Sequence, residues 1–143
     1  MERHEKLVAN IFKKNNILYQ QAITSSKFIK GKWISNRNDI FSVFDFMILL
    51  HNCVIFIQVT DDHHVSIKKD KIQTEFINKL EKKIDKQFNV YIITYKKKKN
   101  RIIWKIIKYV NDDLWVDVIL YKNTWYTLDN IISYLGERKC HMY

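Results

Sequence analysis

The sequence predicts an α/β domain with a mixed β-sheet flanked by helices, and three neighbouring segments support this prediction. Val54–Ile57 is continuously apolar, which is typical of a central strand covered on both faces. Ser66–Phe88 repeats apolar residues at helical spacing, and Asn89–Tyr95 then has the composition of a strand. We therefore expect a right-handed βαβ crossover from Val54–Thr60 through the helix to Asn89–Tyr95, with antiparallel strands around it.

Length and composition indicate a single domain spanning residues 1–143. With 47% apolar residues the chain can form a buried core, and no apolar run approaches the roughly 20 residues of a membrane span. There are 25 Lys and Arg residues against 15 Asp and Glu, a net charge of +10. This excess favours a polyanionic partner such as nucleic acid, although a Lys-, Ile- and Asn-rich sequence can also reflect codon usage.

The N-terminal third is expected to be a helix followed by strands. Met1–Lys14 carries an apolar stripe at helical spacing, and Glu5 lies near its start, where negative charge suits the helix dipole. Ile17–Ser26 fits either an extension of this helix or a short strand. Lys27–Ser35 has strand character, and Ser35–Asp39 is rich in turn-forming residues and predicts a loop.

Asp39–Thr60 is expected to form two apolar strands joined by a turn at His51 and Asn52. Asp45 is flanked by two phenylalanines, and a buried carboxylate costs several kcal/mol unless it is paired or bound to metal. Gln58 and Thr60 are two residues apart and therefore share one face of their strand. An acidic strand residue followed by this polar pair is the pattern of a nuclease metal site.

The remaining elements follow from alternating apolar patterns and from turn residues. Lys96–Asn100 reads as a basic turn, and Gly136 is typical of the residue after a helix. The expected elements are a strand at Arg101–Val110, a turn at Asn111–Asp113, a strand at Leu114–Tyr121 and a helix at Leu128–Leu135.

These residues resemble the motifs of the PD-(D/E)XK nuclease superfamily, in particular its Holliday-junction-resolvase-like archaeal and viral branch. Glu5 resembles the glutamate of the first helix, Ser35–Asp39 the polar loop, and Phe44–Met47 the metal-binding strand. Gln58-Val59-Thr60 is similar to a variant of the usual (D/E)-x-K motif. The resemblance covers residues 1–72 and implies a restriction-endonuclease-like fold, metal-dependent cleavage of DNA and a homodimer.

The resemblance implies a site for Mg²⁺ or Mn²⁺ with oxygen ligands. Asp45 would be the central ligand, with the Gln58 amide oxygen, the Val59 carbonyl and Glu5 beside it. Such a cation neutralises developing charge and lowers the pKa of a bound water. The catalytic set would be Glu5, Asp45, Gln58, Thr60 and Lys69.

Two departures from the motif bear on activity. Gln58 lacks the charge of the usual acid, and Thr60 replaces the lysine that orients the attacking water, so another cation such as Lys68 or Lys69 must supply that charge. Simpler explanations stay open for each residue. Asp45 can form an ion pair, Gln58 can be a buried amide, Thr60 can reflect strand propensity, and Glu5 can serve the helix dipole alone.

Basic residues around the expected site predict the nucleic-acid contacts. Lysines and arginines bind phosphate without reading sequence. The residues expected to do so are Arg37, Lys68, Lys96, Lys97 and Lys98. A catalytically weak or inactive nucleic-acid-binding protein on the same fold is the alternative function, because Gln58 and Thr60 replace charged residues.

Cysteine use and the absence of a signal peptide predict where the chain acts. Cys53 lies within an apolar strand, and two cysteines make no disulfide framework, so we expect Cys53 to be a buried free thiol. A reducing, intracellular and cytoplasmic setting is expected, which for a viral protein would be the cytoplasm of the host.

Overall fold

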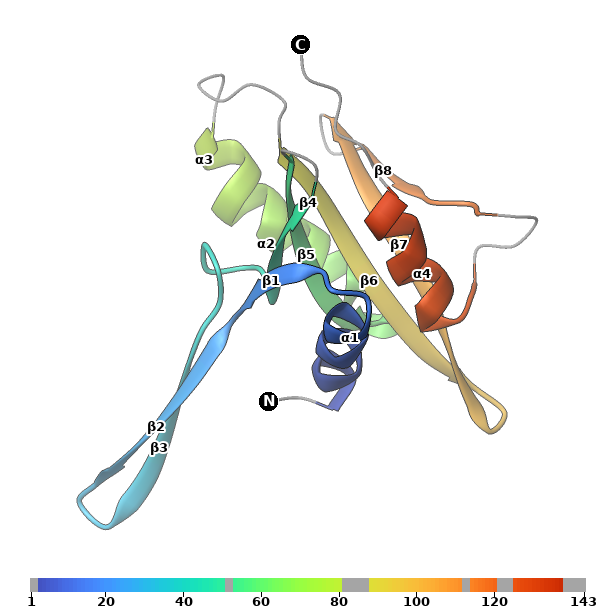
Figure 1. Ribbon diagram of the computed structural model, residues 1–143. Helices are drawn as coiled ribbons and strands as arrows, with labels where there is room; N and C mark the ends of the chain where they lie inside the picture. The colour runs from blue at the N-terminus through green and yellow to red at the C-terminus, as the bar shows by residue number, and fades with distance from the viewer. Residues whose placement is uncertain (1–2, 51–52, 81–87, 112–113, 121–124, 138–143) are drawn as a thin grey trace.

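A computed structural model describes residues 3–50, 53–80, 88–111, 114–120 and 125–137. Its centre is a six-stranded mixed sheet in the order β1-β4-β5-β6-β7-β8 (Figure 1). The strands β5 and β6 are parallel, and every other neighbouring pair is antiparallel. The sheet strands are β1 (Leu18–Gln21), β4 (Phe46–Leu50), β5 (Cys53–Asp61), β6 (Phe88–Lys98), β7 (Arg101–Asn111) and β8 (Leu114–Asp117). The predicted α/β class with a mixed sheet is confirmed.

Helical turns between β5 and β6 make the parallel pair possible, as the sequence predicts. They comprise η1 (Asp62–His64), α2 (Val65–Ile72), the π-helical segment η2 (Gln73–Ile77) and α3 (Asn78–Leu80). The helix predicted for Ser66–Phe88 was wrong at its end, because Phe88 pairs with Val54 as the first residue of β6. The turn predicted at His51-Asn52 lies outside the described residues, as do Asp112 and Asp113 of the turn predicted for Asn111–Asp113.

Helices cover both faces of the sheet and divide the core in two. On one face α1 (Arg3–Lys14) and α4 (Leu128–Glu137) pack against the sheet through residues such as Phe12 and Ile132. On the other face the α2–α3 segment contributes Ile72 and Phe76, which pack against Phe56 of β5. Figure 1 shows these helices on opposite sides of the sheet. The central strand β5 is therefore buried on both faces, which explains its unbroken apolar run.

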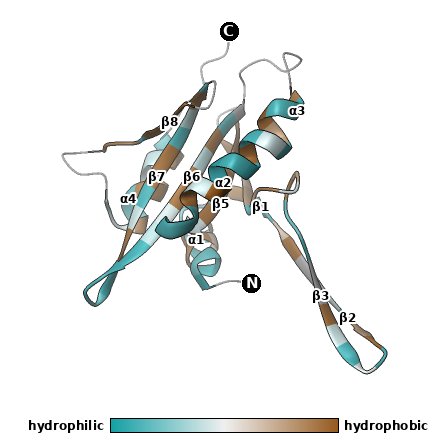
Figure 2. Ribbon diagram, turned by 180° about the vertical axis from the view of Figure 1, so that it is seen from behind, coloured by the Kyte–Doolittle hydropathy of each residue, from teal (hydrophilic) through white to brown (hydrophobic). Residues whose placement is uncertain are grey.

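Two further strands form a separate hairpin, which we call the arm. It consists of β2 (Ile23–Ile29) and β3 (Lys32–Asn38) and extends away from the sheet (Figures 1 and 2). The strand predicted for Lys27–Ser35 was wrong, because a turn at Lys30-Gly31, with positive φ at both residues, divides it. The loop predicted for Ser35–Asp39 was also wrong, since pairing with β2 keeps the chain extended to Asn38.

The arm carries apolar residues although it protrudes from the sheet, and Cys53 is not the free thiol that the sequence predicts. Figure 2 shows hydrophobic segments in the protruding arm as well as along the strands of the sheet. Cys53 is buried but disulfide-bonded, so the expectation of a free thiol was wrong. Its partner lies outside the described residues, and the bond removes the cysteine argument for a reducing compartment. None of the described helices is long and apolar enough to cross a membrane.

Candidate functional site

The candidate site lies where β5 continues past the first residue of its neighbour β4. The Asp45 N–H still donates to the Ile57 carbonyl at 3.0 Å, as in a strand ladder. Beyond this bond the Asp45 side chain replaces the neighbouring strand, because its Oδ2 accepts the Val59 N–H at 2.7 Å. In an extended strand the N–H and C=O of one residue point to the same side. The Val59 carbonyl therefore faces the same edge as Asp45.

The first helix brings Glu5 to this edge. Glu5 lies one turn before the buried residue Val8 and shares its face of α1, so its carboxylate is carried inward. The preceding residue, His4, stacks on Tyr95 of β6 with ring centroids 3.6 Å apart, which anchors the start of the helix. Glu5 and Asp45 are each only 3% exposed. Packing thus places two carboxylates 40 residues apart in the chain beside each other.

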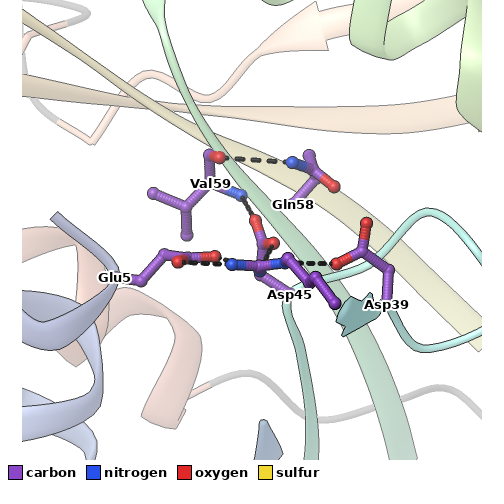
Figure 3. Close-up of polar contacts among 6 residues, drawn as sticks. Glu5, Asp39, Asp45, Gln58 and Val59 are labelled. Atoms are coloured by element: carbon purple, nitrogen blue, oxygen red, sulfur yellow. Dashed lines mark hydrogen bonds and ion pairs between the residues drawn. The ribbon is translucent and has the colours of Figure 1, made fainter. Parts of the chain in front are cut away.

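Arg37 binds both of these carboxylates and a third. Its Nη1 donates to Glu5 Oε2 at 2.9 Å, and its Nη2 donates to Glu5 Oε1 and to Asp45 Oδ1. Its Nε donates to Asp39 Oδ1 at 2.6 Å. Figure 3 shows Glu5, Asp39 and Asp45 converging beside Val59. We call Glu5, Asp39 and Asp45 the carboxylate cluster.

The carboxylate cluster carries more negative charge than Arg37 neutralises. Three carboxylates share one guanidinium, which leaves two negative charges in excess when all are ionised. Burial, followed by the bond and charge of Glu5, raises the pKa of Asp45 to about 8. The bond to Glu5 raises the already high pKa of Arg37. The cluster therefore retains a proton near neutral pH. A second positive charge bound at the cluster would displace this proton.

Gln58 is linked to the cluster through Val59, and Thr60 follows Val59 in the same strand. Both are buried, and the Gln58 Nε2 donates to the Val59 carbonyl at 3.2 Å. Because this bond uses the amide nitrogen, the amide oxygen is the atom that Gln58 can offer to a cation. Thr60 is in register with Thr94 of β6 and brings no charge. Asp45, Glu5, Gln58 and Val59 are thus grouped, with Thr60 next in the strand.

The predicted lysines lie elsewhere. Lys68 and Lys69 are in α2, and among the described residues no hydrogen bond or ion pair joins either to the carboxylate cluster. Lys96, Lys97 and Lys98 are exposed on the hairpin of β6 and β7, and Lys96 Nζ lies 4.2 Å from the ring centroid of Trp125. The cation that the fold brings to the site is therefore Arg37.

Sequence reasoning missed this role of Arg37. It placed Arg37 among the residues that contact nucleic acid, whereas the structure bonds its guanidinium to three carboxylates. The sequence contains one usable signal, because Arg37 is the only basic residue between Trp33 and Asp45. Two acids, Asp39 and Asp45, lie in the same segment and compete for it.

The donor atoms at this edge fit a hard divalent cation. Two buried carboxylates, an amide oxygen and a backbone carbonyl are the oxygen ligands that Mg²⁺ and Mn²⁺ accept. In the described part of the chain no set of three His, Cys, Asp or Glu side chains is arranged to hold a metal by itself. Arg37 lies between the carboxylates, so such a cation would have to displace its guanidinium.

Comparison with known proteins adds no relative to this picture. No protein-family model matches the sequence, and neither a curated protein nor a solved structure matches the chain. The argument for function is therefore built on the carboxylate cluster, the edge of β5 and the charge of the chain.

Proposed function

We propose that this chain is a metal-dependent endonuclease that hydrolyses phosphodiester bonds in DNA, including branched or viral DNA. The proposal is carried by one observation: the buried carboxylates of Glu5 and Asp45 both bind the Arg37 guanidinium, and Asp45 also binds the Val59 N–H. Fold stability alone gives little reason to gather three carboxylates around one guanidinium, because buried charge is costly. An excess of buried acid beside a backbone carbonyl is instead suited to holding a divalent cation.

In this proposal each residue has a separate task. Glu5 and Asp45 would hold the cation, and the Gln58 amide oxygen and the Val59 carbonyl would be further ligands. Bound Mg²⁺ or Mn²⁺ supplies positive charge to the phosphate and lowers the pKa of a bound water. Thr60 shapes the strand and supplies no charge. A DNA substrate implies action inside a cell, in the cytoplasm or in that of a viral host.

Arg37 takes the task that Thr60 cannot perform. With a divalent cation held by Glu5 and Asp45, the Arg37 guanidinium would give up its bonds to them but could keep its 2.6 Å bond to Asp39, which lies nearer the surface. Its Nη atoms would then be available to bind a phosphate oxygen of the DNA. Lys68 and Lys69 of α2 add sequence-independent phosphate contacts. A homodimer is part of this proposal through the family resemblance.

A second function is favoured by the same arginine. Arg37 already satisfies Glu5 and Asp45 without a metal, so the fold is complete as a nucleic-acid-binding module. In that case the chain would bind DNA through its basic surface and cleave nothing. The net charge of +10 supports binding in both cases and does not separate them.

A cleavage assay separates the two functions. Supercoiled plasmid and a four-way junction are incubated with the full chain in Mg²⁺, in Mn²⁺ and in EDTA. We expect cleavage with either metal and none in EDTA. Asp45→Asn should abolish it, while Asp70→Asn, which changes an exposed acid of α2, should not. Full cleavage by Asp45→Asn would exclude the nuclease, and DNA binding without any cleavage would select the alternative.

A further inference from the structure

The arm exposes an aromatic pair that the protein itself does not cover. Phe28 and Trp33 are cross-strand partners, with ring centroids 5.3 Å apart. Their exposed fractions are 61% and 73%, the latter the largest among the exposed apolar side chains of the described residues. Large aromatic side chains are normally buried because each removes much apolar surface from water. This pair is therefore available to bind a partner.

The charge of the arm indicates what kind of partner it can be. Lys27 and Lys32 adjoin the aromatic residues in sequence and point to the opposite face of the arm, and Lys30 lies in its turn. All three are exposed, and no acidic residue occurs from Ile23 to Ile34. A second copy of this chain would bring the same positive arm, so arm-to-arm pairing would place like charges together. A polyanion with exposed aromatic faces complements both properties. Single-stranded DNA is such a partner, since lysines contact its phosphates and aromatic rings stack on its bases.

The aromatic pair lies on the same face of the arm as Arg37. Side chains alternate along a strand, so Trp33 and Arg37, four residues apart in β3, point to one face. Four residues of strand span about 13 Å. A DNA segment that reaches the carboxylate cluster can therefore extend along this face to the aromatic pair. Ile34 points to the opposite face and offers a matched control.

We propose that the arm binds unpaired bases of DNA through Phe28 and Trp33, so that the preferred substrate contains a single-stranded segment next to the cleavage site. The inference rests on the proposed function for the cleavage step but not for binding. In a duplex each base is stacked between its neighbours, and an aromatic side chain reaches a base face only where the strand is unpaired. Flaps, forks and bubbles offer such bases.

Binding is tested in EDTA, where no cleavage occurs. The fluorescence anisotropy of a labelled 20-nucleotide oligo-dT and of a 20-base-pair duplex is titrated with the full chain. We expect Trp33→Ala and Phe28→Ala each to weaken oligo-dT binding about tenfold, with duplex binding changed less than about twofold. Ile34→Ala should leave both unchanged. Equal affinity of Trp33→Ala and the unchanged protein for oligo-dT would overturn the inference.

Further measurements separate the arm assignment from the nuclease assignment and from self-association through the arm. If Trp33→Ala weakens oligo-dT binding but the unchanged protein cleaves no DNA with either metal, the arm assignment stands and the nuclease assignment fails. If the chain cleaves DNA but Trp33→Ala binds and cleaves flapped substrates as well as before, the arm assignment fails alone. Sedimentation velocity tests the remaining alternative, which is that the arm binds a second copy of this chain. A change from dimer to monomer in Trp33→Ala, with oligo-dT binding intact, would assign the arm to self-association and overturn the inference.

Discussion

The two ends of strand β3 have opposite surroundings. At its base, Arg37 is held by three carboxylates, two of them buried. At its tip, Trp33 is 73% exposed and packs against one neighbouring ring, Phe28. The base pairs its arginine with carboxylates of the protein, whereas the tip leaves apolar surface in water. The difference suggests that one short strand serves chemistry at one end and recognition at the other, and the two should be separable by mutation.

The largest expected effect is at the base. Glu5→Gln keeps the size of the side chain but removes one charge from the carboxylate cluster, so cleavage should fall about a hundredfold or more. Oligo-dT binding in EDTA should stay within about twofold, because the tip is unchanged. The rates are compared with those of Glu137→Gln, which alters an exposed acid of α4. Loss of both activities together would break the separation between base and tip.

The next effect is the pH dependence of metal binding. A divalent cation binds the ionised form of Asp45, whose pKa is raised to about 8, so binding must release a proton. The affinity for Mn²⁺ should therefore rise about tenfold per pH unit from pH 6 to 7 and level off above about 8. Isothermal titration in two buffers of different ionisation enthalpy measures both affinity and proton release. A flat profile would show that Asp45 is already ionised.

The same pKa shift makes a statement about stability. The folded pKa of Asp45 lies above its unfolded value of 3.8, so the folded metal-free chain binds the proton more tightly. Its stability should therefore fall as the pH rises from about 4 to about 8. Asp45→Asn removes this titration. Melting temperatures of the two proteins should converge at low pH and separate toward pH 8, with the asparagine variant the more stable there.

A smaller effect concerns competition between Arg37 and the metal. Arg37→Ala removes the guanidinium from the carboxylate cluster, so Mn²⁺ should bind about tenfold more tightly while cleavage falls. The metal-free variant should melt earlier, and Mn²⁺ should restore much of the loss. Arg101→Ala on the hairpin of β6 and β7 is the control, since Arg101 is exposed. Unchanged metal affinity in Arg37→Ala would show that the guanidinium and the cation do not share a site.

The smallest effect is on salt dependence. Each lysine that loses a phosphate contact should reduce the log–log salt slope by about 0.7 for a single strand and about 0.9 for duplex DNA. Lys27→Gln on the arm should lower the slope for oligo-dT. Lys98→Gln on the hairpin of β6 and β7 should lower the slope for duplex. If both variants change both slopes equally, the two hairpins act as one uniform basic surface.

The sequence predicted the elements whose patterns are dictated by burial. The apolar run in β5 and the helical spacing after Ser66 identify a crossover, and the structure pairs β5 with β6 in parallel. Asp45, Gln58 and Val59 were expected together and lie together, because a strand and its neighbour fix their separation. These features follow from period and polarity within a short stretch of chain.

The arm and the partners of Arg37 could not be predicted in this way. Ser35–Asn38 is composed of turn-forming residues, but pairing with β2 overrides their local preference. The bonds of Arg37 to Glu5 cross 32 residues, and no local period reports such a contact. The exposed aromatic pair was also hidden, because the pattern of an apolar strand does not show whether anything covers it.

The part of β5 that continues past the first residue of β4 has a consequence for solubility as well. Where β4 is absent, β5 presents a strand edge to which another chain could add itself, and such edges promote aggregation. The Asp45 side chain occupies this edge by accepting the Val59 N–H, so an incoming strand cannot take that hydrogen bond. The residue at the centre of the proposed chemistry thus also protects the sheet against edge-to-edge assembly.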